Sequence, residues 1–166
     1  MQNIILVGDS AVGKSSFVLK LTRDAFTESY ISTVAKEMVT IDDVIIHDTA
    51  SNSRFKELCR EYYKHANAAL VFYDVHNANR EKIMRWISEL RSENSQIPIM
   101  VIGNKIDLGK YKEINFGDIK TMYISCKTGE NVNVVMKEIK QIMTKTLPPE
   151  NQLSWTGWAY SYCYLQ

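Results

Sequence analysis

The sequence has little of what marks a secreted, membrane-spanning or nucleic-acid-coating protein. Its 20 basic and 19 acidic residues give a formal net charge of +1, so bulk charge does not draw it to nucleic acid or to an anionic membrane. The three cysteines, Cys59, Cys126 and Cys163, show neither metal-ligand spacing nor a disulfide framework, which favours a reducing compartment. The apolar run at residues 4–7 is too short for a signal peptide, and no run approaches the roughly 20 apolar residues that cross a bilayer. We therefore expect a cytoplasmic protein with one folded core.

Short apolar runs alternate with helical patterns along the 166 residues. Continuous apolar runs predict strands that are buried on both faces, as in a parallel sheet. The expected strands lie at 4–7, 68–73, 99–102 and, more weakly, 122–124. Apolar residues at helical spacing predict helices across 55–62, 83–90 and 132–143. The alternation predicts an α/β fold, a doubly wound and mostly parallel sheet with helices on both faces.

Two segments depart from this alternation. In residues 39–46, Asp42-Asp43 separates two short β-branched runs, which predicts a hairpin at a sheet edge. The two prolines after Leu147 end the last helix near that residue, because the residue before a proline avoids helical geometry. We expect the folded domain to cover residues 1–146.

Residues 8–15 match the pattern G-x-x-x-x-G-K-[ST] of a phosphate-binding P-loop, and they follow a predicted strand and open a helix, as the motif requires. Backbone N–H groups of such a loop converge on a phosphate anion. Lys14 supplies a cation to the β- and γ-phosphates, and the Ser15 hydroxyl is a hard oxygen ligand for Mg²⁺. A chance match arises in about one chain in a hundred or fewer. The predicted contacts with the phosphates are Ser10, Ala11, Val12, Gly13, Lys14, Ser15 and Ser16.

Residues 104–107 read N-K-I-D directly after the predicted strand at 99–102. Here the sequence resembles the Ras superfamily of small GTPases, whose guanine motif is N-K-x-D. The Asp107 carboxylate only accepts hydrogen bonds, so it pairs with two N–H donors on one edge of guanine. Adenine lacks that pattern, and such a site can reject the wrong partner by roughly 10⁴-fold or more. The predicted contacts with the base are Asn104, Lys105 and Asp107.

The resemblance adds three further contacts after the last strand run and two aromatic residues. Residues 125–127 resemble the S-A-K motif, which implies that a backbone N–H near Cys126 meets the guanine carbonyl and that Ser125 supports Asp107. Cys126 is equally consistent with a small buried filler. Phe26 falls where the family places an aromatic beside the base, and Tyr30 where it places a tyrosine over the phosphates. Both also fit exposed loop aromatics. The S-A-K-like motif predicts contacts with the base from Ser125, Cys126 and Lys127.

The segments that respond to the γ-phosphate in the family also have counterparts here. Residues 28–34 resemble the corresponding sequence of the Rab branch. This resemblance implies that Thr33 reaches Mg²⁺ only when the γ-phosphate is present. Asp48 opens the motif D-T-A and is implied to hold the metal through water. The metal set implied by the resemblance is Ser15, Thr33 and Asp48, and the catalytic set is Lys14, Thr33 and Asn52.

The chain departs from the family pattern in three places. Ser51 replaces a glycine that gives its N–H to the γ-phosphate; serine keeps the N–H but loses conformational freedom. Asn52 replaces the water-positioning glutamine and is one methylene shorter, and a misplacement of about 1 Å can cost on the order of 10²-fold in rate. The segments between Thr33 and Asp48 and between Asp107 and Ser125 are shorter than in relatives. We expect a short edge hairpin and only a turn or two of helix after Asp107.

Residues 147–166 form an aromatic-rich tail with a single charge, Glu150. The last four residues, C-Y-L-Q, fit the C-a-a-X signal for attaching a lipid to Cys163. Without a basic run upstream, a single lipid would anchor the chain only marginally. The alternation of Trp158, Tyr160, Tyr162 and Tyr164 with smaller residues also fits a strand that packs on the domain or on a partner. Both readings stay open.

The resemblance implies a Rab-type switch that binds GTP and GDP with Mg²⁺, hydrolyses GTP slowly and works in vesicle or membrane trafficking. Its implied partners are exchange factors, GTPase-activating proteins (GAPs) and effectors, with attachment to the cytosolic face of endomembranes if Cys163 is lipidated. The main alternative is a guanine-nucleotide-binding scaffold with little or no catalysis, motivated by Ser51 and Asn52. An ATP-using kinase is a distant third hypothesis, because Asp107 disfavours adenine.

Overall fold

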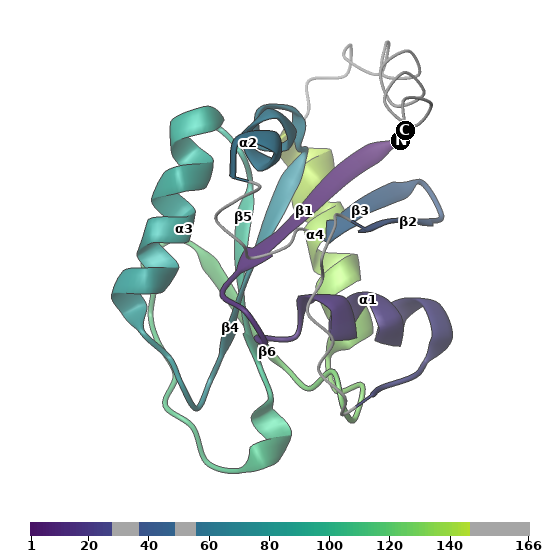
Figure 1. Cartoon of the computed structure of the whole chain (residues 1–166), viewed down its shortest axis with the longest axis vertical. Coiled ribbons are helices and arrows are strands. Elements are labelled where there is room, and N and C mark those ends of the chain that lie inside the picture. Colours follow the sequence, from purple (N-terminus) through teal and green to yellow (C-terminus); the bar gives the residue numbers. More distant parts are fainter. Residues whose placement is uncertain (28–36, 49–55, 147–166) are drawn as a thin grey trace.

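The computed structural model describes residues 1–27, 37–48 and 56–146. Six strands form one sheet in the order β2-β3-β1-β4-β5-β6 (Figure 1). Neighbouring strands are parallel except for the antiparallel pair β2–β3. The strands are β1 (Gln2–Gly8), β2 (Glu37–Ile41), β3 (Val44–Asp48), β4 (Ala68–Asp74), β5 (Ile99–Asn104) and β6 (Lys120–Ile124). The helices are α1 (Lys14–Arg23), α2 (Lys56–His65), α3 (Arg80–Glu93), the 3-10 turn η2 (Ile106–Leu108) and α4 (Val132–Thr146).

The sheet is covered on both faces, because its central strands are apolar on both sides. In β1, Ile4 and Leu6 pack in one cluster with residues of α1 and α4. Ile5 and Val7 point to the opposite face and pack with residues of α2 and α3. Figure 1 shows α1 and α4 on one side of the sheet and α2 and α3 on the other. This confirms the predicted doubly wound architecture.

The predicted elements are found close to their expected positions. The hairpin forms at the sheet edge, where β2 is the outermost strand and Asp42-Asp43 makes the turn. α4 ends at Thr146, one residue before the position expected from the prolines. β6 begins at Lys120, two residues earlier than its apolar run indicated.

Helix at Asp107 is limited to one short turn, which agrees with the predicted turn or two. This turn is η2, and residues 109–116 have no regular structure. Aromatic rings fill the space instead: Tyr111 lies 5.2 Å from Tyr123 and Phe116 lies 6.2 Å from Tyr73, between ring centroids. The backbone N–H of Ile114 donates to the Tyr123 hydroxyl at 2.9 Å. Ring packing and this hydrogen bond therefore hold a segment that is too short for a longer helix.

The parallel pairing brings several loops to one edge of the sheet. Asp74, Asn104 and Ile124 are partners at the carboxyl ends of β4, β5 and β6. Gly8 ends β1 opposite Phe72 of β4, and Asp48 ends β3 opposite Leu6. In open parallel sheets, ligands bind outside the carboxyl ends of the strands.

We expect Leu70→Ala to lower the free energy of unfolding by about 2–5 kcal/mol, because it removes fully buried atoms in the centre of the sheet and leaves a cavity. Leu108→Ala is the matched control, since it removes the same atoms from a side chain that is 62% exposed and should change stability by about 0.5 kcal/mol or less. Denaturant unfolding followed by circular dichroism measures both values. Equal losses in the two variants would contradict the placement of Leu70 in the core.

Candidate functional site

The loop between β1 and α1 adopts a shape that side chains at two of its positions would prevent. Gly8 and Gly13 both have positive φ angles, 138° and 101°. A Cβ at Gly13 would lie 2.0 Å from the Asn104 side-chain nitrogen, so no other residue fits there. Ala11 also has a positive φ of 61°, which is uncommon for a residue with a Cβ. The two glycines therefore permit close approach to the neighbouring strands, Gly8 to Phe72 of β4 and Gly13 to Asn104 of β5.

Lys14 lies inside this loop, at the first turn of α1. Its ammonium group donates to the carbonyl oxygens of Gly8 at 2.9 Å and Asp9 at 2.8 Å. Burial lowers the pKa of Lys14 to about 8, although the carboxylates of Asp48 and Asp9 oppose the shift. A buried cation is stabilised further by an anion, so the loop is suited to a phosphate ligand.

Two of the three predicted metal ligands lie together. The Ser15 hydroxyl donates to a carboxylate oxygen of Asp48, which is almost fully buried at the end of β3. A hydroxyl and a carboxylate are hard oxygen donors of the kind that Mg²⁺ prefers, so these residues fit that ion. Thr33, the third predicted ligand, lies outside the described residues.

Asn104 connects three loops at the edge of the sheet. Its side-chain nitrogen donates to the Val12 carbonyl at 2.9 Å, and its side-chain oxygen accepts from the Cys126 N–H at 3.1 Å. Asn104 is buried, at 2% exposure. The sequence motif predicted that Asn104 contacts the base, and the resemblance implied that an N–H near Cys126 meets the guanine carbonyl. In this structure the Cys126 N–H donates to Asn104, and Asn104 donates to the P-loop.

Ser125 and Asp107 come together as the resemblance implied. The Ser125 hydroxyl donates to one Asp107 carboxylate oxygen at 2.6 Å and accepts from the Thr128 N–H at 3.0 Å. Ser125 is fully buried, whereas Asp107 is exposed. The loop after β6 therefore orients an accessible carboxylate, and the same loop contacts the P-loop through Cys126.

Comparison with known proteins agrees with this arrangement. Residues 3–145 match the Ras family. The chain belongs to the Ras family. It is 36% identical to the GTP-binding protein ypt5 of Schizosaccharomyces pombe, over 92% of this chain and 81% of that protein. It is 32% identical to the Ras-related protein Rab-5A of Dictyostelium discoideum (86% and 81% covered) and 31% identical to the Ras-related protein RABF2b of Arabidopsis thaliana (89% and 84% covered). These relatives make it a Rab-like small GTPase of the Ras superfamily.

The remaining predicted residues of this Rab-like chain lie in several different segments. Ser10, Ala11 and Val12 lie in the P-loop, and Ser16 lies in the first turn of α1. Lys127 is exposed in the loop after β6. Phe26 is 37% exposed in the segment after α1. Tyr30, Ser51 and Asn52 lie outside the described residues, as does Thr33.

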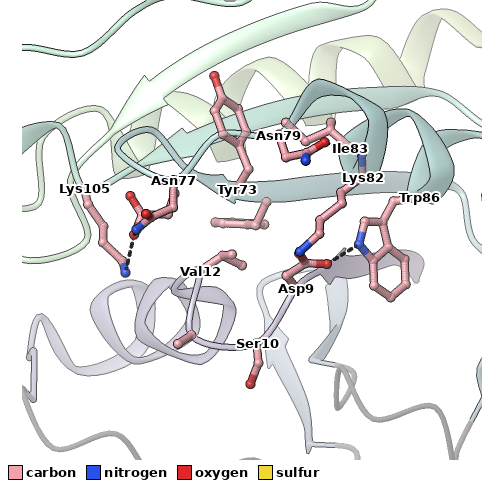
Figure 2. Close-up of a pocket in the computed structure, with 13 residues that line it drawn as sticks. Asp9, Ser10, Val12, Tyr73, Asn77, Asn79, Lys82, Ile83, Trp86 and Lys105 are labelled. Carbon is pink, nitrogen blue, oxygen red and sulfur yellow. Dashed lines mark hydrogen bonds and ion pairs between the residues drawn. The ribbon is translucent and has the colours of Figure 1, made fainter.

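A pocket of about 270 Å³ opens beside the P-loop, and several of its residues were missed from the sequence (Figure 2). Asp9 of the P-loop accepts from the Trp86 indole at 3.0 Å and lies 3.5 Å from the Lys82 ammonium, both on α3. Across the pocket, Lys105 donates to Asp74 at 2.8 Å. Asp74 could have been found as the polar residue that ends a buried strand. Nothing in the spacing of α3 pointed to Trp86 as a P-loop contact.

The Cys126 thiol is expected to resist alkylation in the native protein. Burial raises its pKa to about 12, despite its contact with the Asn104 side chain. At pH 8 only about 10⁻⁴ of such a thiol is ionised, against roughly a quarter for an unperturbed cysteine. Iodoacetamide treatment followed by peptide mass spectrometry measures the extent of alkylation at Cys126 separately from that at Cys59 and Cys163. Protein unfolded in guanidinium chloride is the control. Equal labelling of Cys126 in native and unfolded protein would show that this environment is wrong.

Proposed function

We propose that this Rab-like chain is a guanine-nucleotide switch that binds GTP and GDP with Mg²⁺, hydrolyses GTP and acts in membrane trafficking. Its family and its relatives, one of them named a GTP-binding protein, support this activity. The observation that carries the proposal is the 2.6 Å hydrogen bond from Ser125 to Asp107. It orients an exposed carboxylate next to the loops that carry Lys14 and Asn104, and that carboxylate can accept two guanine N–H donors.

The phosphates of the nucleotide are proposed to bind at the P-loop. Residues 10–16 supply N–H groups, and Lys14 exchanges its carbonyl partners for phosphate oxygens. Ser15, Asp48 and Thr33 are the residues that would hold Mg²⁺, which supplies positive charge to the phosphate oxygens when bound. Lys14 stabilises the negative charge that develops in the transition state. Thr33 and Ser51 are proposed to report the γ-phosphate to effectors.

Hydrolysis is proposed to be slow because Asn52 stands where the family has glutamine. The shorter amide reaches less far towards the attacking water. Exchange factors and GAPs are proposed as partners, and a GAP that supplies an arginine and a glutamine would bypass Asn52. Phe26 and Tyr30 are proposed to cover the base and the phosphates.

The chain is proposed to divide into a GTPase domain at 1–146 and an aromatic tail at 147–166. If Cys163 carries a lipid, the single anchor gives marginal membrane binding. The proposed location is therefore cytoplasmic, with reversible attachment to the cytosolic face of endomembranes. Among the residues that the structure describes, none of the helices combines the length and apolar character needed to cross a bilayer.

Asp107→Asn should weaken GDP binding by about 10²-fold or more, because two hydrogen bonds to a charged acceptor contribute about 1.5–3 kcal/mol each. Equilibrium binding of fluorescent GDP, with ADP as competitor, measures affinity and base selectivity together. Asp118→Asn is the matched control, since Asp118 is an exposed carboxylate after the aromatic-packed segment. An unchanged preference for guanine in Asp107→Asn would contradict the assignment of Asp107 to the base site.

Asn52→Gln should raise the intrinsic rate of GTP hydrolysis, by up to about 10²-fold, because the longer side chain restores the reach to the water. Single-turnover hydrolysis of pre-bound GTP measures the chemical step. The rate of GDP dissociation from the same variant serves as the control and should not change. A rate of hydrolysis equal to or below that of the unaltered chain would contradict the proposed role of Asn52.

A further inference from the structure

The base-site lysine is held by a carboxylate from the neighbouring strand. Asp74 ends β4 and pairs in register with Asn104, which ends β5, so Lys105 begins its loop beside Asp74. The Lys105 ammonium donates to Asp74 at 2.8 Å. Figure 2 shows Lys105 and Asn77 on one side of the pocket, across from Lys82 and Trp86.

Asp74 is itself fixed in place. Its carboxylate accepts from the His76 N–H at 2.9 Å and from the Asn77 side chain at 3.4 Å, and the residue is 9% exposed. Burial works against its charge, but the hydrogen bonds from Lys105 and His76 outweigh it and hold the pKa of Asp74 below its usual range. Asp74 is therefore a rigid anion at the carboxyl edge of the sheet.

Lys105 is constrained at both ends. Its backbone is in the left-handed region, with φ of 74° and ψ of 35°, which is strained for a residue with a Cβ. Such strain persists only where the surrounding contacts hold the backbone in place. Here the preceding residue, Asn104, is hydrogen-bonded to two other loops. The Leu108 N–H also donates to the Lys105 carbonyl at 3.2 Å. The ion pair with Asp74 then fixes the tip of the side chain.

The side chain of Lys105 lies beside the P-loop, on the loop that also carries Asp107. Asp107 is two residues along the chain, and Ser10, Ala11 and Val12 of the P-loop line the same pocket as Lys105. A nucleotide that joins the P-loop to Asp107 would contact both loops, and Lys105 belongs to one and lines a pocket with the other. A lysine stem that is already ordered loses less entropy when a ligand packs against it.

We propose that Asp74 is a positioning residue for the nucleotide, which acts by fixing Lys105 in the direction that the bound nucleotide requires. This inference rests on the proposed function. Because Lys105 is 32% exposed, its ion pair with Asp74 contributes little to folding stability, and the loss of the pair should show mainly in nucleotide residence time.

The test is a double-mutant cycle on the full chain loaded with fluorescent GDP and chased with excess GDP. Asp74→Asn keeps an acceptor for the His76 N–H but loses the charge, and should speed GDP dissociation by about tenfold. Lys105→Met should speed it by a similar factor. If Asp74 acts through Lys105, adding Asp74→Asn to Lys105→Met should change the rate by less than about twofold. Asp118→Asn is the control for the loss of a carboxylate.

Each outcome decides the matter. Rate effects that multiply in the double variant would overturn the positioning role, and so would an unchanged rate in Asp74→Asn. If the unaltered chain retains no GDP, the proposed function falls and the role of Asp74 falls with it. If it retains GDP and only the cycle fails, the proposed function stands and the inference about Asp74 is wrong.

Discussion

The side-chain amide of Asn104 is the contact on which the geometry of the site depends. One buried amide pairs with the Val12 carbonyl and the Cys126 N–H, so the P-loop and the loops after β5 and β6 are held at fixed separations. Without it, two buried backbone groups would lose their partners, at a cost of about 1–3 kcal/mol each. The absence of a side chain at Gly13 follows from the same contact, since a Cβ would occupy the position of the Asn104 amide.

A second set of contacts holds the P-loop from its outer side. Asp9 accepts from Trp86 and lies near Lys82, so the loop is attached to α3. α3 also contacts α2, where Arg60 and Glu93 approach to 3.6 Å. Exposed ion pairs of this kind contribute little energy individually. Their consequence is geometric, because the P-loop and α2 both contact α3.

The shortened segments are held by contacts that replace regular structure. At the edge hairpin, Lys140 of α4 lies 3.2 Å from Asp42 and 3.0 Å from Asp43, which ties the turn to the last helix. After η2, the ring pairs Tyr111–Tyr123 and Tyr73–Phe116 pack the loop against the sheet. Among the described residues of the site, the P-loop, Asn104 and the loop after β6 lie outside these shortened segments.

The order of elements, the P-loop and the polar residues that follow β5 and β6 could all be predicted from the amino-acid sequence. Those features are local, because strand runs, helical spacing and a glycine-rich loop act over a few neighbouring residues. The same local reasoning placed the hairpin and the end of α4 to within a residue or two.

Which of these residues contact one another could be seen only in the folded chain. The contacts of Asp74 with Lys105, of Asp9 with Trp86 and of Asn104 with Val12 join residues that are 31 to 92 positions apart. Such pairs depend on strand order and on how the helices pack, which no local pattern contains. For the same reason the helical spacing of α3 gave its buried face correctly, while the role of Trp86 at the P-loop became visible only in the folded chain.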